Sequence, residues 1–342
     1  MKKLLFIVLA FTMVFSMAAC SKTEPTTPTA PTAPAAGADA GPAAPDGYPG
    51  GKNINIIVGY GAGGASDVCA RTLVPYLEDI LGTTVTVINK PGSGSWIAWK
   101  EVMAMKPDGY NLTFVNTGMS TTRLNPEAPY EEDITDLEVL AGQCSDNNVL
   151  GINPKDTRFN DLASLIEYAK TNEVTYVVTG VGTEDQIAVE KINVALGTKF
   201  VPVIMSNGTV EGLTAVMGGH VDVISCNCSE IITYNANNEI KAICYFGEER
   251  SVFLPDVPTF EEVGGILIDS FSARGFAMPA GGDPELVEYL SAAFEEAMSH
   301  PDYIADMSKM YLDAVYMSPD ELLRKTDVCV SNLEQVADRI GW

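Results

Sequence analysis

Short apolar runs alternate with segments of helical periodicity along most of the chain from residue 54 onward. The first run, INIIVGY (54–60), has the composition of a buried strand. Apolar side chains then recur at helical spacing from Val68 to Leu81, and Gly82 is placed to end that helix. This alternation is typical of βα units around mainly parallel sheets, so the sequence predicts an α/β fold.

The same pattern predicts the remaining elements. Strands are expected at 84–89, 111–117, 148–153, 175–180, 199–205, 221–226, 240–246 and 271–279. Helices are expected near 95–105, at 161–171, at 183–196 before Gly197, at 208–218, from Asp283 and Pro284 onward, and in two final segments, the last beginning near Ser318 and Pro319. The C-terminal helices have no sheet of their own, so they are expected to return to the first half of the body.

The length of this body favours two lobes, because roughly 290 residues exceed a typical single hydrophobic core. We expect domain 1 to comprise residues 51–147 together with 271–342, and domain 2 to comprise residues 148–270. The chain would then cross between the lobes near residues 140–150 and again near 270–278.

The first residues have the order of an export signal: Lys2 and Lys3, an apolar stretch, and small residues before Cys20. The stretch is too short for a stable membrane span. The sequence SMAAC resembles the lipobox of bacterial lipoproteins, which implies a lipoprotein signal peptide at 1–19 and a lipid on Cys20. An ordinary secretory signal cut near Ala19 is the alternative. Residues 20–50, rich in Pro, Ala and Thr, are predicted to form a disordered linker that tethers the body to the membrane.

Charge and cysteine content narrow the possible partners. The net charge of −24 becomes −26 without Lys2 and Lys3, which argues against nucleic acid and anionic lipid surfaces. Neither histidine, His220 or His300, has metal-ligand spacing, so no metal site is expected. The other cysteines show no disulfide framework and are predicted to be buried thiols, with Cys226 and Cys228 pointing the same way at a strand end: Cys69, Cys144, Cys226, Cys228, Cys244 and Cys329.

A glycine-rich loop, GYGAGGASD (59–67), follows the first strand. Gly59, Gly61 and Gly64 satisfy the G-x-G-x-x-G spacing of dinucleotide-binding sites. The next strand, however, ends in Asn89 and Lys90, where such a site needs an acid for the ribose. No Gly-Lys-Ser or Gly-Lys-Thr follows the loop, which excludes a Walker phosphate loop. No cofactor is therefore expected.

The loop keeps its capacity to bind an anion, because glycines expose backbone amides and the following helix directs its free N–H groups to the same place. Ser66 is a candidate N-cap, and a capping role alone for Ser66 and Asp67 is the alternative. Similar loops follow other strands, and in open α/β sheets such loops gather at one cleft. The candidate ligand-binding residues are Tyr60, Gly61, Ala62, Gly63, Gly64, Ala65, Ser66, Asp67, Gly94, Ser95, Thr117, Gly118, Gly182 and Thr183.

Seven segments in order make the body resemble the substrate-binding receptors of tripartite tricarboxylate transporters, the Bug family: INIIVGYGAGGASDVCAR, VINKPGSGS, KPDGYNLTFVNTG, GVGTEDQIAV, MGGHVDV, LPDVPTFEEVG and GFAMPAG. The resemblance implies a two-domain periplasmic-binding-protein fold, type II-like, with a mainly parallel sheet flanked by helices in each domain. It implies a receptor that closes on a small organic anion, such as a di- or tricarboxylate, an acidic amino acid or an aromatic acid. The export signal predicts an extracytoplasmic location, and we expect a monomer. A two-subunit membrane permease is the implied partner.

The sequence departs from the family pattern near the implied site. The first loop lacks the usual prolines, Gln186 stands where histidine is common, and Val203 replaces a tyrosine before a segment with Ser206 and Asn207. Gln186, Ser206 and Asn207 are counted as ligand-binding candidates. Arg274 occupies a commonly aromatic hinge position, and we hypothesise that it pairs with a ligand carboxylate. The alternative is a hinge ion pair with Asp146 or another acid.

Two other functions are alternatives to a tripartite receptor. An exported enzyme acting on a small acid would need a nucleophile with its base, and the chain has no G-x-S-x-G and no histidine in a glycine-rich loop. We therefore expect no enzymatic activity. A binding protein of an ABC or TRAP transporter keeps the same binding role with another partner.

Overall fold

The computed structural model describes residues 42–127, 130–205 and 208–342. The predicted signal peptide, Cys20 and most of the predicted linker lie outside the described residues, as do Ser206 and Asn207.

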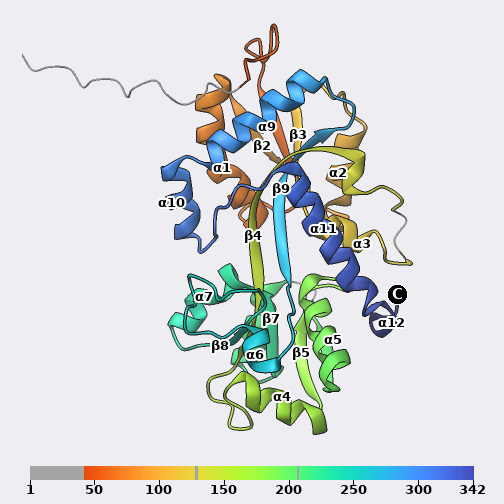
Figure 1. The fold of residues 1–342 in the computed structure, drawn as a ribbon, viewed down its shortest axis with the longest axis vertical. Helices are drawn as coiled ribbons and strands as arrows, with labels where there is room; N and C mark the ends of the chain where they lie inside the picture. The colour runs from red at the N-terminus through yellow and green to blue at the C-terminus, as the bar shows by residue number, and fades with distance from the viewer. Residues whose placement is uncertain (1–41, 128–129, 206–207) are drawn as a thin grey trace, which may run out of the picture. The chain divides into compact units, whose positions relative to one another are not determined.

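The first sheet has the strand order β2, β1, β3, β9, β4 (Figure 1). Its first three strands are parallel, and β9 runs antiparallel to both β3 and β4. We call this sheet and its helices the first lobe. Its elements before the crossing are β1 (Ile54–Val58), α1 (Ala65–Leu81), β2 (Val85–Asn89), η1 (Ser93–Ser95), α2 (Trp96–Met103), β3 (Asn111–Asn116), α3 (Gly118–Thr122) and η2 (Ile134–Asp136).

The second sheet consists of β8, β4, β7, β5 and β6, in which β5 is parallel to both β6 and β7, and β4 is antiparallel to β7 and β8. We call it and its helices the second lobe. Its elements are α4 (Leu162–Thr171), β5 (Val174–Val178), α5 (Glu184–Leu196), β6 (Phe200–Ile204), α6 (Thr209–Met217), β7 (Val223–Asn227), α7 (Cys228–Ala236), β8 (Lys241–Tyr245) and α8 (Phe260–Gly264).

One long strand, β4 (Leu137–Ile152), belongs to both sheets. Its residues 137–147 pair with β9 (Phe271–Pro279), whereas residues 148–152 pair with β7 and β8. Figure 1 shows β4 and β9 running side by side. Because the strands point toward each other from the two sheets, the carboxyl ends of β1 and β3 face those of β5 and β7.

The C-terminal helices return to the first lobe, as the sequence predicts. They are α9 (Pro284–Met298), α10 (Pro301–Lys309), α11 (Pro319–Glu334) and α12 (Ala337–Ile340). Helices α9 and α10 pack on α1, and α11 packs on β4, β9 and α3. Helix α11 also reaches α5 of the second lobe, which the sequence did not indicate.

The structure confirms several local signals of the sequence at the ends of helices and in one strand. Gly82 and Gly197 end α1 and α5 in left-handed conformation, where a side chain would be strained. The Asp283 side chain accepts the N–H of Glu285 at the start of α9, and Pro284 is its first residue. Strand β9 spans the predicted residues 271–279.

Several expectations were wrong. Ser66 is not an N-cap, because α1 begins at Ala65 with Gly64 as the cap, so Ser66 lies inside the first turn. Cys226 and Cys228 do not share a strand face, because β7 ends at Asn227 and Cys228 begins α7. Helix α7, α12 and the first part of β4 were not predicted.

The linker also ends earlier than residue 50. The Tyr48 ring packs against Tyr110 and Tyr289, and its hydroxyl donates to the Gly109 carbonyl at 2.9 Å. The ordered body therefore includes residues just before Gly51. The six cysteines within the described residues are all buried and free, as expected of core thiols.

Candidate functional site

The loop between β1 and α1 has exposed residues on one side and is held by a buried side chain on the other. Residues 61–65 are exposed, while Asp67 is buried beneath them. The Asp67 carboxylate accepts the Gly63 N–H at 2.8 Å and hydrogen bonds from Asn89 at 2.8 Å and Arg71 at 2.9 Å. Burial opposes ionisation of Asp67, but these bonds outweigh it and lower the pKa of the carboxyl. The loop is thus preorganised by an ionised side chain.

Two neighbouring loops of the first lobe contact the loop between β1 and α1. Ser95, from the loop after β2, lies so close to Gly59 that a Cβ at residue 59 would come within 2.7 Å of the Ser95 Cα. Asn116, at the end of β3, donates to the Tyr60 hydroxyl at 2.6 Å. Thr117 donates its N–H to the Ala273 carbonyl of β9 at 3.0 Å. Candidate residues from three loops of the first lobe therefore come together. Gly94 stays on the exposed side of its turn.

The loop between β5 and α5 repeats this design in the second lobe. The Asp185 carboxylate accepts the Thr179 N–H at 3.1 Å, as Asp67 accepts that of Gly63. Gly182 donates its N–H to the Gln186 side chain at 2.8 Å, and the Thr183 hydroxyl donates to the Gly180 carbonyl at 2.6 Å. These bonds hold Gly182, Thr183 and Gln186 in one tight turn.

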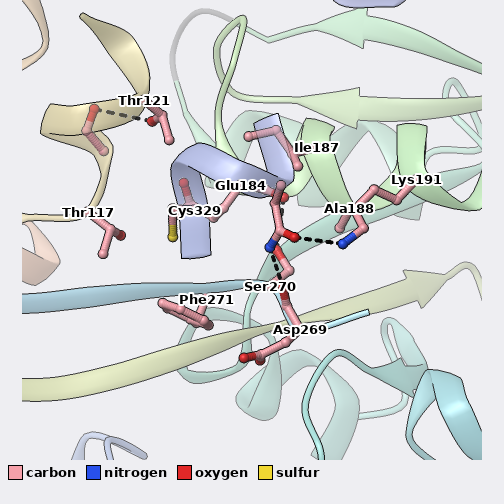
Figure 2. A pocket seen from close by; sticks show the side chains of 12 residues that line it. Thr117, Thr121, Glu184, Ile187, Ala188, Lys191, Asp269, Ser270, Phe271 and Cys329 are labelled. Atoms are coloured by element: carbon pink, nitrogen blue, oxygen red, sulfur yellow. Dashed lines mark hydrogen bonds between the residues drawn. The ribbon is translucent and has the colours of Figure 1, made fainter. Parts of the chain in front are cut away.

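Loops of both lobes line a small cavity beside β9. Thr117 and Gly118 contribute from the first lobe, and Glu184 and Ile187 contribute from α5 (Figure 2). The Ser270 hydroxyl, just before β9, donates to the Glu184 carbonyl at 2.9 Å. The free volume is about 10 Å³, enough for no more than one water molecule. The lobes are thus closely packed at this edge.

Arg274 lies at the centre of the arrangement. Its guanidinium is 3.5 Å from the Asp146 carboxylate, and the two side chains are only 5% and 2% exposed. Asp146 also accepts the Ser229 hydroxyl of α7 at 2.6 Å. The ion pair that the sequence offered as the alternative is therefore present, and it joins both lobes through Ser229.

Carboxyl groups surround this arginine from the second lobe. Burial raises the pKa of Glu184 to about 7 and also raises that of Glu230, while the Arg274 charge opposes both shifts. Burial likewise raises the pKa of Tyr60, again opposed in part by Arg274. Tyr60 of the first lobe, Arg274 of β9 and Glu184 of the second lobe are therefore within electrostatic range of one another.

The acids Glu184 and Glu230 were missed by sequence reasoning, although Glu184 falls within a loop that it singled out. Both lie in the first turn of a helix, where an acid normally serves the helix dipole. Asn116 was not counted as a candidate, although it begins a polar loop at the end of a predicted strand.

Within the described ranges no group of three or more His, Cys, Asp or Glu side chains could hold a metal ion. No helix formed by the described residues is long and apolar enough to cross a bilayer.

Comparison with known proteins assigns the family. Residues 69–341 match the model of the tripartite tricarboxylate transporter family receptor. A protein of Cupriavidus necator described as "UPF0065 protein in gbd 5'region" is 30% identical over 293 residues, covering 85% of this chain and 88% of the relative.

Two solved structures share the fold. A TctC solute-binding protein from Polaromonas, solved without ligand, superposes with a TM-score of 0.72 at 23% identity, covering 84% of this chain and 99% of that one. An R. palustris protein solved with adipate gives a TM-score of 0.74 at 21% identity, covering 84% and 97%. The chain therefore belongs to the tripartite tricarboxylate transporter receptor family, the Bug receptors, whose members are extracytoplasmic solute-binding proteins of the two-domain periplasmic-binding-protein fold.

Proposed function

We propose that the protein captures a small organic carboxylate between its lobes and delivers it to a two-subunit permease of the tripartite tricarboxylate type. The observation that carries the proposal is that Tyr60, Arg274 and Glu184, which come from opposite lobes and the strand that joins them, lie within electrostatic range of one another. The adipate bound in the R. palustris relative supports a carboxylate as ligand.

The backbone amides near the proposed site can supply the free energy that micromolar binding of a carboxylate requires. Micromolar affinity requires about 8 kcal/mol, and a hydrogen bond to a charged group contributes about 1.5 to 3 kcal/mol. The exposed turn at residues 61–65 and the N-terminus of α1 can offer such bonds, through amides other than those of Gly63 and Gly64, which already donate to Asp67 and Gly61. A ligand carboxylate that reached Arg274 would share it with Asp146.

The acids near Arg274 suit this role when they are protonated. A neutral Glu184 can donate a hydrogen bond to a carboxylate, whereas an ionised one repels it. Because the pKa of Glu184 is raised to about 7, both forms exist near neutral pH. The chain's negative charge elsewhere has little influence, because exposed charges beyond about 8 Å are largely screened at physiological salt.

The proposal includes a hinge and an anchor. Domain 1 would comprise residues 51–147 and 271–342, and domain 2 residues 148–270, with β4 and the start of β9 as the hinge. Cleavage of the signal at 1–19 and a lipid on Cys20 would fix the receptor to the membrane through a linker that begins at residue 20 and ends before Tyr48. Incorporation of labelled fatty acid into the wild type and its loss in Cys20→Ser would support the anchor, and labelling of both would contradict it.

A thermal-shift screen with dicarboxylates, tricarboxylates, acidic amino acids and aromatic acids tests the binding function. A ligand at 100 times its dissociation constant adds about 2.7 kcal/mol to the free energy of unfolding, an easily measured shift. At least one acid class should raise the melting temperature, and the acid should be recovered unchanged. Absence of any shift across all classes, or consumption of the acid, would contradict the proposal.

A further inference from the structure

The C-terminal segment forms a third link between the lobes, in addition to β4 and β9. At its start, Met317 bridges to Gly142 of β4, and Leu322 fills the space beside Gly275 of β9. A Cβ at residue 275 would come within 2.6 Å of the Leu322 side chain, so glycine is what allows α11 to approach so closely. The first half of α11 is therefore fixed to the first lobe.

The second half of the segment is fixed to α5. Leu333 and Val336 are buried against Ile187 in one apolar cluster that also includes Ile340 and Trp342. Asn332 accepts a hydrogen bond from the Lys191 ammonium at 2.7 Å and donates to the Asp269 carbonyl at 3.1 Å, beside the cavity of Figure 2. We call residues 332–342 the C-terminal strap.

Arg339 of the strap neutralises a buried acid. Its Nε lies 2.6 Å from the Glu190 carboxylate, whose side chain is only 5% exposed. Glu190 also accepts hydrogen bonds from Tyr176 at 3.0 Å and Asn193 at 3.0 Å, both within the second lobe. Without Arg339 this buried carboxylate would have no cation among the contacts of the described residues, which is costly in a low-dielectric interior.

Trp342 lies against the turn that carries the candidate site of the second lobe. Gly182 has φ +78°, and a Cβ there would come within 2.6 Å of the indole Cζ2 and closer still to Cη2. The backbone N–H of Trp342 donates to the Ala337 carbonyl at 2.9 Å, which fixes the main chain from which the ring projects. The indole thus covers the turn at Gly182, two residues before Glu184, the first residue of α5.

We propose that the C-terminal strap positions the ligand turn at residues 180–184, with Trp342 and Arg339 as positioning residues. The strap limits the conformations of the turn before a ligand arrives, so that less ordering free energy is lost on binding. This inference rests on the proposed function only for its effect on affinity. The effect on the turn itself is independent of any ligand.

Hydrogen exchange measured by mass spectrometry on the ligand-free full chain tests the proposal. Trp342→Ala should raise the exchange rate of the peptide covering residues 180–186 by about tenfold, with no change in β4 and β9, and Trp342→Phe should largely restore protection. Arg339→Ala should have a similar local effect. The matched control is Arg324→Ala, because Arg324 bonds only to the Asp320 carbonyl of its own helix in the described contacts.

Unchanged exchange at 180–186 in Trp342→Ala would overturn the proposal, as would a rise spread evenly over the chain or an equal effect of Arg324→Ala. Calorimetric titration with adipate gives a second readout, in which Trp342→Ala should weaken binding several-fold. If the wild type does not bind adipate, that result counts against adipate as ligand, and the exchange rates alone decide whether the strap acts on the turn.

Discussion

Asp146 and Arg274 stand diagonally across β4 and β9, since Cys144 is opposite Arg274 and Asp146 is opposite Ser272. Their charged ends lie 3.5 Å apart in a space that water hardly reaches. The register of two antiparallel strands thus creates the ion pair, and it does so at the point where β4 passes from one sheet to the other. A movement between the lobes would act directly on this pair.

Removal of one partner should therefore cost more than removal of both. We expect Arg274→Gln to lower the free energy of unfolding by about 3 to 5 kcal/mol, because Asp146 would remain buried without its cation. The double variant Asp146→Asn with Arg274→Gln should be less destabilised. Urea unfolding of the three proteins measures this difference.

The same double variant separates the two roles considered for Arg274. If Arg274 binds the ligand, carboxylate affinity stays low in the double variant even though stability is recovered. Full affinity in the double variant would show that Arg274 serves the ion pair alone.

Glu184 should make carboxylate binding depend on pH. Its pKa is raised to about 7 from the ordinary value of 4.5, so the ionised form that repels an anion accumulates above neutral pH. We expect affinity to fall from pH 6 to pH 8 by about tenfold, which corresponds to about 1.4 kcal/mol of repulsion. Titration calorimetry should show a flat profile for Glu184→Gln, and an unchanged profile in that variant would assign the pH effect to another group.

Glu184 should also affect stability, with a definite sign. A carboxyl whose pKa is raised in the folded state favours folding while protonated, and this contribution is lost as pH rises from about 4.5 to about 7. Glu184→Gln should therefore be more stable than the wild type at pH 8 and closer to it at pH 5. Melting temperatures of the wild type and Glu184→Gln at pH 5 and pH 8 measure this difference in stability.

Asp67→Asn should loosen the first glycine turn. The asparagine keeps an acceptor for Gly63 but loses the charge that attracts Arg71, so we expect a loss of about 1 to 3 kcal/mol in the free energy of unfolding at pH 7. Because the pKa of Asp67 is lowered in the folded state, this difference should shrink as the pH falls below 3.8. Asp79→Asn, an exposed change on the same helix, is the control and should leave unfolding unchanged.

Two glycines of the same loop should respond differently to alanine. Gly59→Ala would force apart the loops after β1 and β2, because the new Cβ would overlap Ser95, and a cost of about 1 to 3 kcal/mol is expected. Gly61→Ala meets no atom within 4 Å and has no left-handed φ, so its effect on stability should be within about 0.5 kcal/mol. Equal melting temperatures for both variants would contradict the close packing of these loops.

The sequence predicts the elements of the fold correctly where nearby residues alone determine the local backbone conformation. Gly82 and Gly197 end helices because glycine tolerates the left-handed conformation, and β1 is buried because a parallel strand is covered on both faces. It failed along residues 137–147 of β4, where Gln143, Asp146 and Asn147 break the apolar pattern of a strand. The hydrogen-bond partners of these side chains come from distant segments, such as Ser229 for Asp146 and the Cys69 carbonyl for the Gln143 amide, which no local pattern reveals.

In the candidate site, too, some residues could be predicted from the sequence and others could not. The glycine turns could be found because their residue types reflect backbone demands. Glu184 and the role of Trp342 could not, because each depends on what lies opposite it across a separation of more than 80 residues in sequence, as the Ser270 bond to Glu184 illustrates. Gly182 was singled out for contact with a ligand, but its outer side faces an indole ring.

In each lobe an aspartate in the first turn of a helix, Asp67 or Asp185, accepts a backbone N–H from the preceding glycine-containing loop. Apart from Gly63, whose φ of +80° favours glycine, the exposed residues 61–65 therefore contribute little through their side chains to the shape of the first turn. Divergence among duplicated receptors can then exchange one metabolite for another by substitutions along this rim, while the scaffold that closes around it is inherited intact.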